Sequence, residues 1–230
     1  MLLQVEHLKK KFKGVVAVDD VSFSVSKNEI VGMIGPNGSG KTTLLNLIAN
    51  TIARNDGDVI FKDTYINEMK PHEIVRLGMG RTFQVCQLFD NMTVLDNMRI
   101  VESSKERIEE LLRFVGLFDF QDRFAYQMSG GQRRLLELAQ VLALGPELIL
   151  LDEPYGGIHP DMISEIAARL RQLNDRGVTF LVVEHNVKSL CKLCKRVIAL
   201  DQGRIIADDV PEKVQQSERV LEAYLGGKRT

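Results

Sequence analysis

The sequence has no excess of charge of either sign, and this absence argues against one class of function at the start. It contains 30 lysines and arginines and 31 aspartates and glutamates, so the formal net charge is −1 at pH 7. Proteins that bind nucleic acid or an anionic membrane surface through charge carry a basic excess or patch. The densest basic run, residues 9–13, is typical of a solvated strand edge. We therefore expect no nucleic acid among the partners of this chain.

Long apolar runs and cysteines are also scarce. No run approaches the length of a membrane-spanning helix, and the first residues are typical of a strand and not of a signal peptide. The chain has 3 cysteines, an odd number that argues against a disulfide framework and suits a reducing cytosol. Cys191 and Cys194 form a lone C-x-x-C, which predicts one face of a helix rather than a zinc site, because no second pair exists. We expect a soluble chain that reaches a membrane only through another subunit.

The order of apolar segments predicts a single α/β domain. The 230 residues suffice for one large core. Strand patterns occupy residues 1–83, helical patterns about 84–130, and continuous apolar strands alternate with amphipathic helices from residue 147 onward, as in a parallel sheet covered on both faces. We predict a core of residues 1–83 and about 131–230 with a helical lobe inserted between them. In that lobe, Ser103 and Glu106 match a capping box.

A glycine-rich segment indicates the chemistry of this domain. Residues 35–43 match G-x-x-x-x-G-K-[ST] between an apolar strand pattern and a helical pattern, a context in which an accidental glycine-rich turn is a poor explanation. Backbone N–H groups of such a loop surround a phosphate at a helix N-terminus. Lys41 can reach the β- and γ-phosphates, and the Thr42 hydroxyl can bind Mg²⁺. The predicted nucleotide ligands of this segment are Gly35, Pro36, Asn37, Gly38, Ser39, Gly40, Lys41, Thr42 and Thr43.

Two carboxylates follow a second buried strand pattern, about a hundred residues further on. Residues 148–151 are all leucine or isoleucine, and Asp152 and Glu153 come next. At the end of such a strand Asp152 would hold Mg²⁺, directly or through water. Glu153 is placed to orient or deprotonate an attacking water. An Asp-Glu pair is common by itself, but after a phosphate loop it predicts hydrolysis of a nucleoside triphosphate.

A third motif, Ser129–Gln132, precedes an amphipathic helix pattern. A small-residue turn at a helix N-terminus can bind an anion, although an ordinary helix cap has the same sequence. The order of the motifs distinguishes the two. The phosphate loop, Gln84, the Ser-Gly-Gly-Gln segment, Asp152-Glu153 and then His185 after an apolar strand resemble the ATP-binding cassette (ABC) ATPases over essentially the whole chain.

This resemblance implies a fold and further site residues. It implies a P-loop NTPase core with a mostly parallel sheet, an N-terminal antiparallel β subdomain and the inserted helical lobe, and it implies ATP and Mg²⁺ as ligands. Phe12 would stack on adenine, with burial in the core as the alternative. Gln84 would sense Mg²⁺ and the attacking water, and His185 would contact the γ-phosphate. The expected catalytic residues are then Glu153, His185 and Gln84, and the expected metal ligands Thr42, Gln84 and Asp152.

The resemblance also implies an assembly. Two cassettes of this family pack head to tail, so that ATP on one phosphate loop meets the signature segment of the other. Here that segment is Ser129, Gly130, Gly131 and Gln132. One chain carries one set of motifs, so we expect a homo- or heterodimer bound to membrane permease subunits at the cytoplasmic face. The apolar residues 85–92, with Leu88 and Phe89, would either pack in the core or form a groove for a short permease helix.

Within the family, the chain is most similar to the ATP-binding subunits of branched-chain amino-acid importers. Residues 80–84, 89–98, 182–186 and 222–226 carry this similarity. It implies an extracytoplasmic solute-binding protein as a further partner. The lipopolysaccharide-export cassette has a similar tail and is the alternative, and urea and amide importers share much of the pattern. A soluble ABC ATPase is less favoured, because such proteins generally fuse two cassettes or add basic arms.

The sequence departs from the family pattern at two positions. His159 stands where most members have Asp in the loop through which the two sites communicate, and Met128 stands where the signature usually begins with Leu. Because histidine changes charge near neutral pH, we expect communication between the sites to depend on pH. The substitution at Met128 is expected to be harmless.

Overall fold

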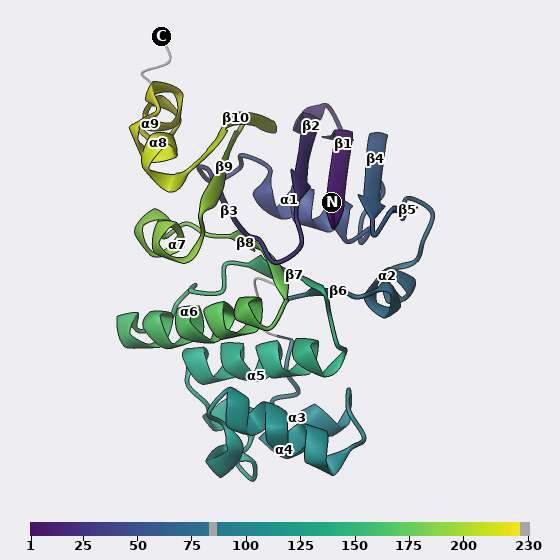
Figure 1. Cartoon of the computed structure of the whole chain (residues 1–230), viewed down its shortest axis with the longest axis vertical. Helices are drawn as coiled ribbons and strands as arrows, with labels where there is room; N and C mark the ends of the chain where they lie inside the picture. The colour runs from purple at the N-terminus through teal and green to yellow at the C-terminus, as the bar shows by residue number, and fades with distance from the viewer. Residues whose placement is uncertain (83–86, 226–230) are drawn as a thin grey trace.

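A computed structural model describes residues 1–82 and 87–225. Figure 1 shows two sheets stacked above a group of helices, with the chain termini near the upper half. The upper sheet is antiparallel, in the order β2-β1-β4-β5. Its strands are β1 (Leu3–Phe12), β2 (Val15–Val25), β4 (Asp56–Phe61) and β5 (Thr64–Tyr65). The expected N-terminal antiparallel β subdomain is therefore confirmed.

The second sheet has the strand order β10-β9-β3-β8-β7-β6. All neighbours from β9 to β6 are parallel, and only β10 pairs antiparallel. The strands are β3 (Ile30–Ile34), β6 (Met79–Arg81), β7 (Leu148–Asp152), β8 (Thr179–Val183), β9 (Arg196–Asp201) and β10 (Arg204–Asp209). The prediction of a mostly parallel sheet is confirmed by these pairings, and β3, β7, β8 and β9 coincide with apolar strand patterns in the sequence.

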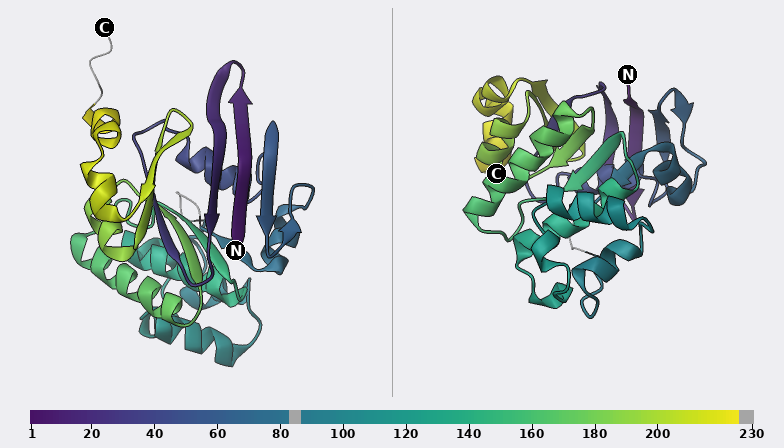
Figure 2. Two further views of the ribbon diagram at one scale, coloured as in Figure 1. Left: turned by 45° about the horizontal axis from the view of Figure 1, so that its top comes forward. Right: turned by 60° about the horizontal axis from the view of Figure 1, so that its bottom comes forward.

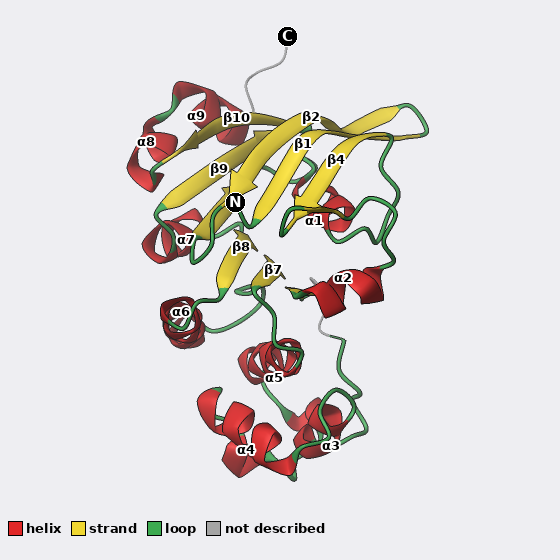
Figure 3. Cartoon of the chain, turned by 45° about the vertical axis from the view of Figure 1, so that its right-hand side comes forward, coloured by secondary structure: helices red, strands yellow, loops and turns green. Residues whose placement is uncertain are grey.

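The apolar strands are buried on both faces because successive side chains enter different cores. In β8, Phe180 and Val182 pack in one core, whereas Leu181 and Val183 pack in the other. The second core lies between the two sheets and includes one face of α1 (Lys41–Ile48). Figure 3 shows the helices on the opposite face of β7 and β8. These are α5 (Gly130–Ala143), α6 (Pro160–Asp175) and α7 (Val187–Leu193).

The helical lobe packs on α5. It contains α3 (Val94–Arg99), α4 (Lys105–Phe114) and two short 3-10 helices, Phe118–Phe120 and Ala125–Gln127. Both α3 and α4 contact α5, and their apolar side chains continue the core that lies beneath the parallel sheet. The predicted capping box at the start of α4 was wrong by one residue. Ser104 caps the helix by accepting from Arg107 N at 3.2 Å, and its hydroxyl donates to the Glu106 carboxylate at 3.1 Å.

Three further helices lie outside the lobe: α2 (Pro71–Leu77), α8 (Pro211–Gln216) and α9 (Glu218–Leu225). Figure 2 shows α8 and α9, in yellow, beside the β9–β10 hairpin from two directions. Cys191 lies in α7 and Cys194 directly follows it, buried in the core. Within the part of the chain that the structure describes, no helix is both long enough and apolar enough to cross a bilayer.

We expect Phe180→Ala to lower the free energy of unfolding by about 3–5 kcal/mol, because Phe180 is 0% exposed and the loss of its ring leaves a cavity in the core beside β8. Urea denaturation followed by circular dichroism measures the change. Tyr65→Ala is the control, since Tyr65 is 62% exposed and its truncation should change stability by no more than about 0.5 kcal/mol. Equal losses in the two variants would contradict the assignment of the core.

Candidate nucleotide site

The glycine-rich loop joins β3 to α1 and packs closely against the backbone of β2 and β9. A Cβ atom on Gly35 would lie 2.1 Å from the Leu200 carbonyl oxygen, and one on Gly40 would lie 2.3 Å from that of Ala17. Gly40 also has φ +104°, a conformation that other residues rarely adopt. Glycine is therefore required at both positions by contacts with β2 and β9, elements remote in sequence from the loop.

Lys41 is folded back into this loop. Its ammonium donates to the carbonyl oxygens of Gly35 at 2.8 Å and Pro36 at 3.0 Å, and lies 3.5 Å from the Ser39 hydroxyl. The side chain is 5% exposed, and burial lowers its pKa, while the carboxylates of Glu153 and Asp152 act in the opposite direction. The loop thus holds a buried cation beside the backbone N–H groups at the start of α1, which suits a polyphosphate.

Asp152 ends β7 next to the start of α1. Its Oδ1 accepts from the Thr42 hydroxyl at 3.3 Å, and its Oδ2 lies 3.6 Å from a guanidinium nitrogen of Arg81. The residue is 1% exposed, and burial raises the pKa of the carboxyl, an effect that Arg81 opposes. Oδ2 is buried and has no hydrogen-bond partner among the residues described. The predicted metal ligands Thr42 and Asp152 are therefore brought together.

Arg81 also contributes to this site, a role that the sequence pattern does not predict. Its side chain is 7% exposed and donates to Asn46 Oδ1 of α1 at 2.7 Å. It therefore connects the end of β6 to both Asp152 and the helix after the loop. A basic residue at the end of a short strand pattern was the available signal, but only the parallel pairing of β6 with β7 makes Asp152 its neighbour.

Glu153 and His185 meet across the site. Glu153 Oε1 lies 2.7 Å from His185 Nε2, and the Glu153 N–H donates to the Val183 carbonyl at 2.9 Å. Glu153 has φ +53°, a left-handed conformation that costs a non-glycine residue about 1–2 kcal/mol. The end of β8 holds this backbone in place. The two predicted catalytic side chains are thus in direct polar contact.

A cavity of about 720 Å³ brings most of these groups together. The residues that line it are Ala17, Asn37, Gly38, Gly40, Lys41, Thr42, Thr43, Glu153 and His185. Gly35, Pro36 and Ser39 form the inner side of the loop, where they contact Lys41. A second hollow of about 780 Å³ borders the antiparallel sheet around Asn50–Asp58 and contains no predicted site residue. The chemistry therefore assigns the smaller cavity to the nucleotide.

Glu184 is a buried acid to which the sequence assigned no role. Its Oε1 accepts from Tyr155 N at 2.6 Å, and its Oε2 accepts from His185 N at 3.1 Å and Asn186 N at 3.3 Å. It is 3% exposed, and burial raises its pKa in opposition to those hydrogen bonds. Glu184 thus ties the segment after Glu153 to the segment that carries His185. An acid in an otherwise apolar strand end was the only signal in the sequence.

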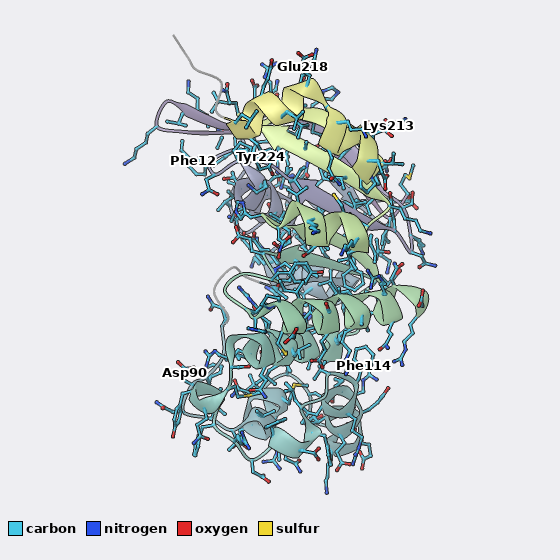
Figure 4. The ribbon with its side chains drawn as sticks, turned by 90° about the vertical axis from the view of Figure 1, so that its left-hand side faces the viewer. Phe12, Asp90, Phe114, Lys213, Glu218 and Tyr224 are labelled. Atoms are coloured by element: carbon cyan, nitrogen blue, oxygen red, sulfur yellow. The ribbon has the colours of Figure 1, made fainter. Side chains whose placement is uncertain are left out.

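Phe12 lies at the end of β1 and is 45% exposed, so the alternative of a core position was wrong. The Lys10 ammonium lies 4.8 Å from the centroid of its ring. Figure 4 shows Phe12 and Asp90 toward the same edge of the molecule, with Phe114 toward the other. Adenine stacking by Phe12 stays a prediction. Gln84 lies outside the residues that the structure describes.

The signature segment lies apart from the nucleotide cavity. The Ser129 hydroxyl accepts from Gln132 N at 3.3 Å, and Gln132 Oε1 accepts from Ser129 N at 3.0 Å, so the segment is also a true capping box for α5. None of Ser129, Gly130, Gly131 and Gln132 lines the described nucleotide cavity. His159 precedes α6, is exposed, and lies with Nδ1 3.3 Å from Asp161 Oδ2. A role for the signature segment in a second molecule's site, and the pH-dependent communication, stay predictions.

Comparison with known proteins places this site in a family. The family model for ABC transporters matches residues 18–156, and one for the branched-chain amino acid ATP-binding cassette transporter matches residues 204–229. The chain is 34% identical over 234 residues to the lipopolysaccharide export system ATP-binding protein LptB of Haemophilus influenzae, covering 98% of this chain and 97% of that protein. It is 34% identical over 247 residues to a probable branched-chain amino acid transport ATP-binding protein LivG of Archaeoglobus fulgidus, covering 99% and 96%.

Solved structures agree with these sequence relatives. An ATP-binding cassette of an ABC transporter in its ADP conformation superposes with a TM-score of 0.92 at 32% identity, covering 98% of both chains. A cassette solved as a dimer in a post-hydrolysis state with ADP and phosphate gives a TM-score of 0.82 at 26% identity, covering 91% of this chain and 98% of that one. The chain belongs to the ABC transporter family. It is an ATP-binding cassette ATPase of the kind coupled to transport, as the sequence predicted.

We expect Glu153→Gln to lower kcat for ATP hydrolysis by about 10²- to 10⁴-fold, because the amide cannot accept a proton from water. ATP binding should persist, since Lys41 and the loop keep their contacts. A phosphate-release assay together with nucleotide titration separates the two. Glu68→Gln, at an exposed position, is the control. Wild-type turnover by Glu153→Gln would show that another group activates water.

We expect Glu184→Ala to lower kcat at least tenfold while the protein stays folded, because backbone N–H groups on both catalytic segments lose a buried acceptor, each at a cost of about 1–3 kcal/mol. Glu184→Gln keeps one acceptor oxygen and should give an intermediate kcat. Steady-state kinetics with parallel thermal unfolding measures this. If all three proteins had the same kcat, the connection between the segments would be unimportant for turnover.

Proposed function

We propose that this chain is the ATP-hydrolysing subunit of a membrane importer for branched-chain amino acids or a related small polar solute. The observation that carries the proposal is the match of residues 204–229 to the branched-chain amino acid cassette model, next to a complete ABC region. The LivG relative at 34% identity supports the same substrate class. The cassette itself contacts no cargo, so the substrate class rests on similarity.

A lipopolysaccharide-type exporter is the second candidate. The observation that favours it is the 34% identity to LptB over 98% of this chain, which equals the identity to LivG. Both candidates use the same hydrolysis, since the nucleotide-site residues are common to the family. They differ in the partners that the cassette drives, so only the partners distinguish them.

The nucleotide loop supplies binding in this proposal. Backbone N–H groups from Gly35 to Thr43 and the Lys41 ammonium neutralise the phosphates, and Phe12 packs on the adenine. Lys41 already lies within the loop, held by two carbonyl groups, so little reorganisation is needed when phosphate oxygens replace them as partners. This pre-organisation supports recognition of a polyphosphate rather than of a single carboxylate.

Hydrolysis in this proposal is performed by the Glu153–His185 pair, with Gln84 as a further expected member. Water attacks the γ-phosphorus, its proton passes to the Glu153 carboxylate, and ADP leaves with the electron pair of the broken P–O bond. His185 lies 2.7 Å from that carboxylate and is placed to hold both it and a γ-phosphate oxygen. Glu184 orients the pair by binding the backbone on either side of it.

The residues at the end of β7 fit Mg²⁺. Asp152 Oδ2 is buried without a hydrogen-bond partner among the described residues, and the Thr42 hydroxyl is bound to the other oxygen of the same carboxylate. Magnesium usually binds one or two protein oxygens and completes its shell with phosphates and water. Thr42 and Asp152 would hold the ion, with Gln84 as the third expected ligand. When bound, it would neutralise charge on the phosphates.

The active unit in this proposal is a dimer bound to permease subunits at the cytoplasmic face of the membrane. Each Ser129–Gln132 segment would meet the ATP on its partner's loop, and its absence from the described cavity of its own chain supports this arrangement. The solved dimer of a 26% identical cassette supports it as well. An extracytoplasmic solute-binding protein would deliver cargo to the permease.

The permease would contact the lobe at Phe89. This side chain is 56% exposed, although its backbone is fixed by hydrogen bonds at 3.0 and 3.1 Å to the buried Asn97 side chain. Asp90 beside it lies 2.6 Å from Arg133, near the start of α5. Leu88 differs, since it packs against the core. Leu88 thus fits the interpretation of this loop as part of the core, and the exposure of Phe89 supports its proposed contact with the permease.

We expect Phe89→Ser to abolish stimulation of the ATPase by the assembled permease while leaving nucleotide binding by the isolated chain unchanged. Leu88→Ser should instead lower thermal stability, because a polar group would enter the core. Ile100→Ser is the matched control, since Ile100 is 50% exposed in the same lobe. Transport and ATPase measured in proteoliposomes test this. Normal coupling in Phe89→Ser would place the permease elsewhere.

Purification of the chain from its native membranes in mild detergent tests the proposed function. Permease subunits together with an extracytoplasmic binding protein would support the importer, and the ligand of that binding protein would name the cargo. A set of envelope proteins spanning both membranes would support lipid export instead. Recovery without any membrane protein would contradict both candidates and favour a soluble ABC ATPase.

A further inference from the structure

The C-terminal helix reaches the phosphate loop through one tyrosine. Tyr224, in α9, accepts a hydrogen bond at 2.8 Å from the N–H of Gly35, a residue 189 positions earlier. Gly35 is buried and begins the loop, so its N–H has little access to water. A buried backbone N–H needs an acceptor. Here the acceptor is a side chain and not a neighbouring strand or turn.

The same C-terminal region holds the other end of the loop. The N–H of Gly203, in the β9–β10 turn, donates to the Ser39 carbonyl at 2.9 Å. Gly203 also accepts from Asp19 N at 2.8 Å, which connects this turn to β2. The loop from Gly35 to Ser39 is therefore bound at its first residue by α9 and near its last by the β9–β10 turn. Both contacts come from residues at or beyond position 203.

The contact at Gly35 bears on Lys41. The Gly35 carbonyl is the nearer of the two that hold the Lys41 ammonium, at 2.8 Å. The N–H of the same residue, Gly35, donates to Tyr224. A shift of the tyrosine would therefore rotate Gly35 and move the carbonyl that holds the Lys41 ammonium. The Leu200 carbonyl also lies close to Gly35, since a Cβ atom on this glycine would be 2.1 Å from the carbonyl oxygen, and this limits movement of the residue toward β9.

The attachment of α9 is slight apart from this bond. Val220 is its one buried side chain among the described residues, and Leu221 and Leu225 are 48% and 82% exposed. The helix contacts α8 and β10. Tyr224 is itself 40% exposed; partial burial raises the pKa of its hydroxyl, while the hydrogen bond from the Gly35 N–H acts in the opposite direction. Figure 4 shows Tyr224 toward Phe12 in that view, with Lys213 of α8 at the far edge.

We propose that Tyr224 is a positioning residue for the nucleotide site: its hydroxyl sets the conformation of Gly35, so that docking of α9 and binding of nucleotide stabilise each other. This rests on residues 35–43 being the nucleotide loop. Reciprocity is required by linkage, since a contact that favours the binding-competent loop is itself favoured when nucleotide occupies that loop. Elements with few buried contacts are those whose opening costs least free energy, so α9 can respond.

Tyr224→Phe in the full chain tests the proposal, because it removes the acceptor and keeps the ring. Titration with methylanthraniloyl-ADP and Mg²⁺ should show a Kd about three- to tenfold above wild type, the range for one lost hydrogen bond. KM for ATP should rise by a similar factor while kcat changes less than twofold. Tyr65→Phe, at a 62% exposed position, is the matched control and should bind like wild type.

A second measurement covers the case in which Tyr224→Phe lowers stability. The chain has no tryptophan, so Leu221→Trp places a single reporter on the exposed side of α9. Adding ADP and Mg²⁺ should shift its emission when Tyr224 is present and leave it unchanged when Tyr224→Phe is added. Equal Kd values for wild type and Tyr224→Phe, equal losses in both tyrosine variants, or equal emission shifts in the two backgrounds would overturn the proposal. A wild-type chain that binds no nucleotide would contradict the proposed function instead.

Discussion

The parallel pairing of β3, β7 and β8 is the constraint on which the rest of the structure depends. Met33 and Asp152 both pair with Val183, so the ends of the three strands lie in one row. Each of these ends continues into a functional segment: the glycine-rich loop, Glu153 and His185. Because parallel strands of matched length end at the same edge of a sheet, residues far apart in the chain become neighbours without any local signal for it.

That edge concentrates charge that the rest of the core excludes. Lys41, Asp152 and Glu184 are each at most 5% exposed. Burial lowers the pKa of the lysine and raises the pKa of the two acids, so that it favours the neutral form of each group. Hydrogen bonds from the backbone and from neighbouring side chains offset part of this cost. The left-handed backbone at Glu153 adds a further cost at the same place. The apolar layers on both faces of the sheet stabilise the fold enough to tolerate these groups, which are the ones that an ATPase needs.

Three regions of the chain that do not line the nucleotide cavity bear on how the cassette works in an assembly. Its own signature segment lies outside the described nucleotide cavity, and its lobe presents Phe89 to solvent on a backbone fixed by Asn97. Its C-terminal region reaches back to the glycine-rich loop at Gly35 and Ser39. Of these three regions, the C-terminal one is in direct contact with the glycine-rich loop.

The sequence by itself determined the apolar strands, the loop and the family, because these follow from the residues in order along the chain: the apolar run at 148–151, the spacing of glycines at 35–40, and the order of the motifs. Tertiary structure alone decided that Glu153 bonds to His185, that Glu184 joins their segments, that Arg81 lies on Asp152 and that Tyr224 caps Gly35. Local periodicity reports which face of an element is apolar, whereas these contacts depend on how strands and helices distant in sequence pack. The N-cap of α4 is a further example: the sequence predicts Ser103, and the structure has Ser104. Both residues are serine, so composition does not distinguish them, and the packing of α4 on α5 decides where the helix begins.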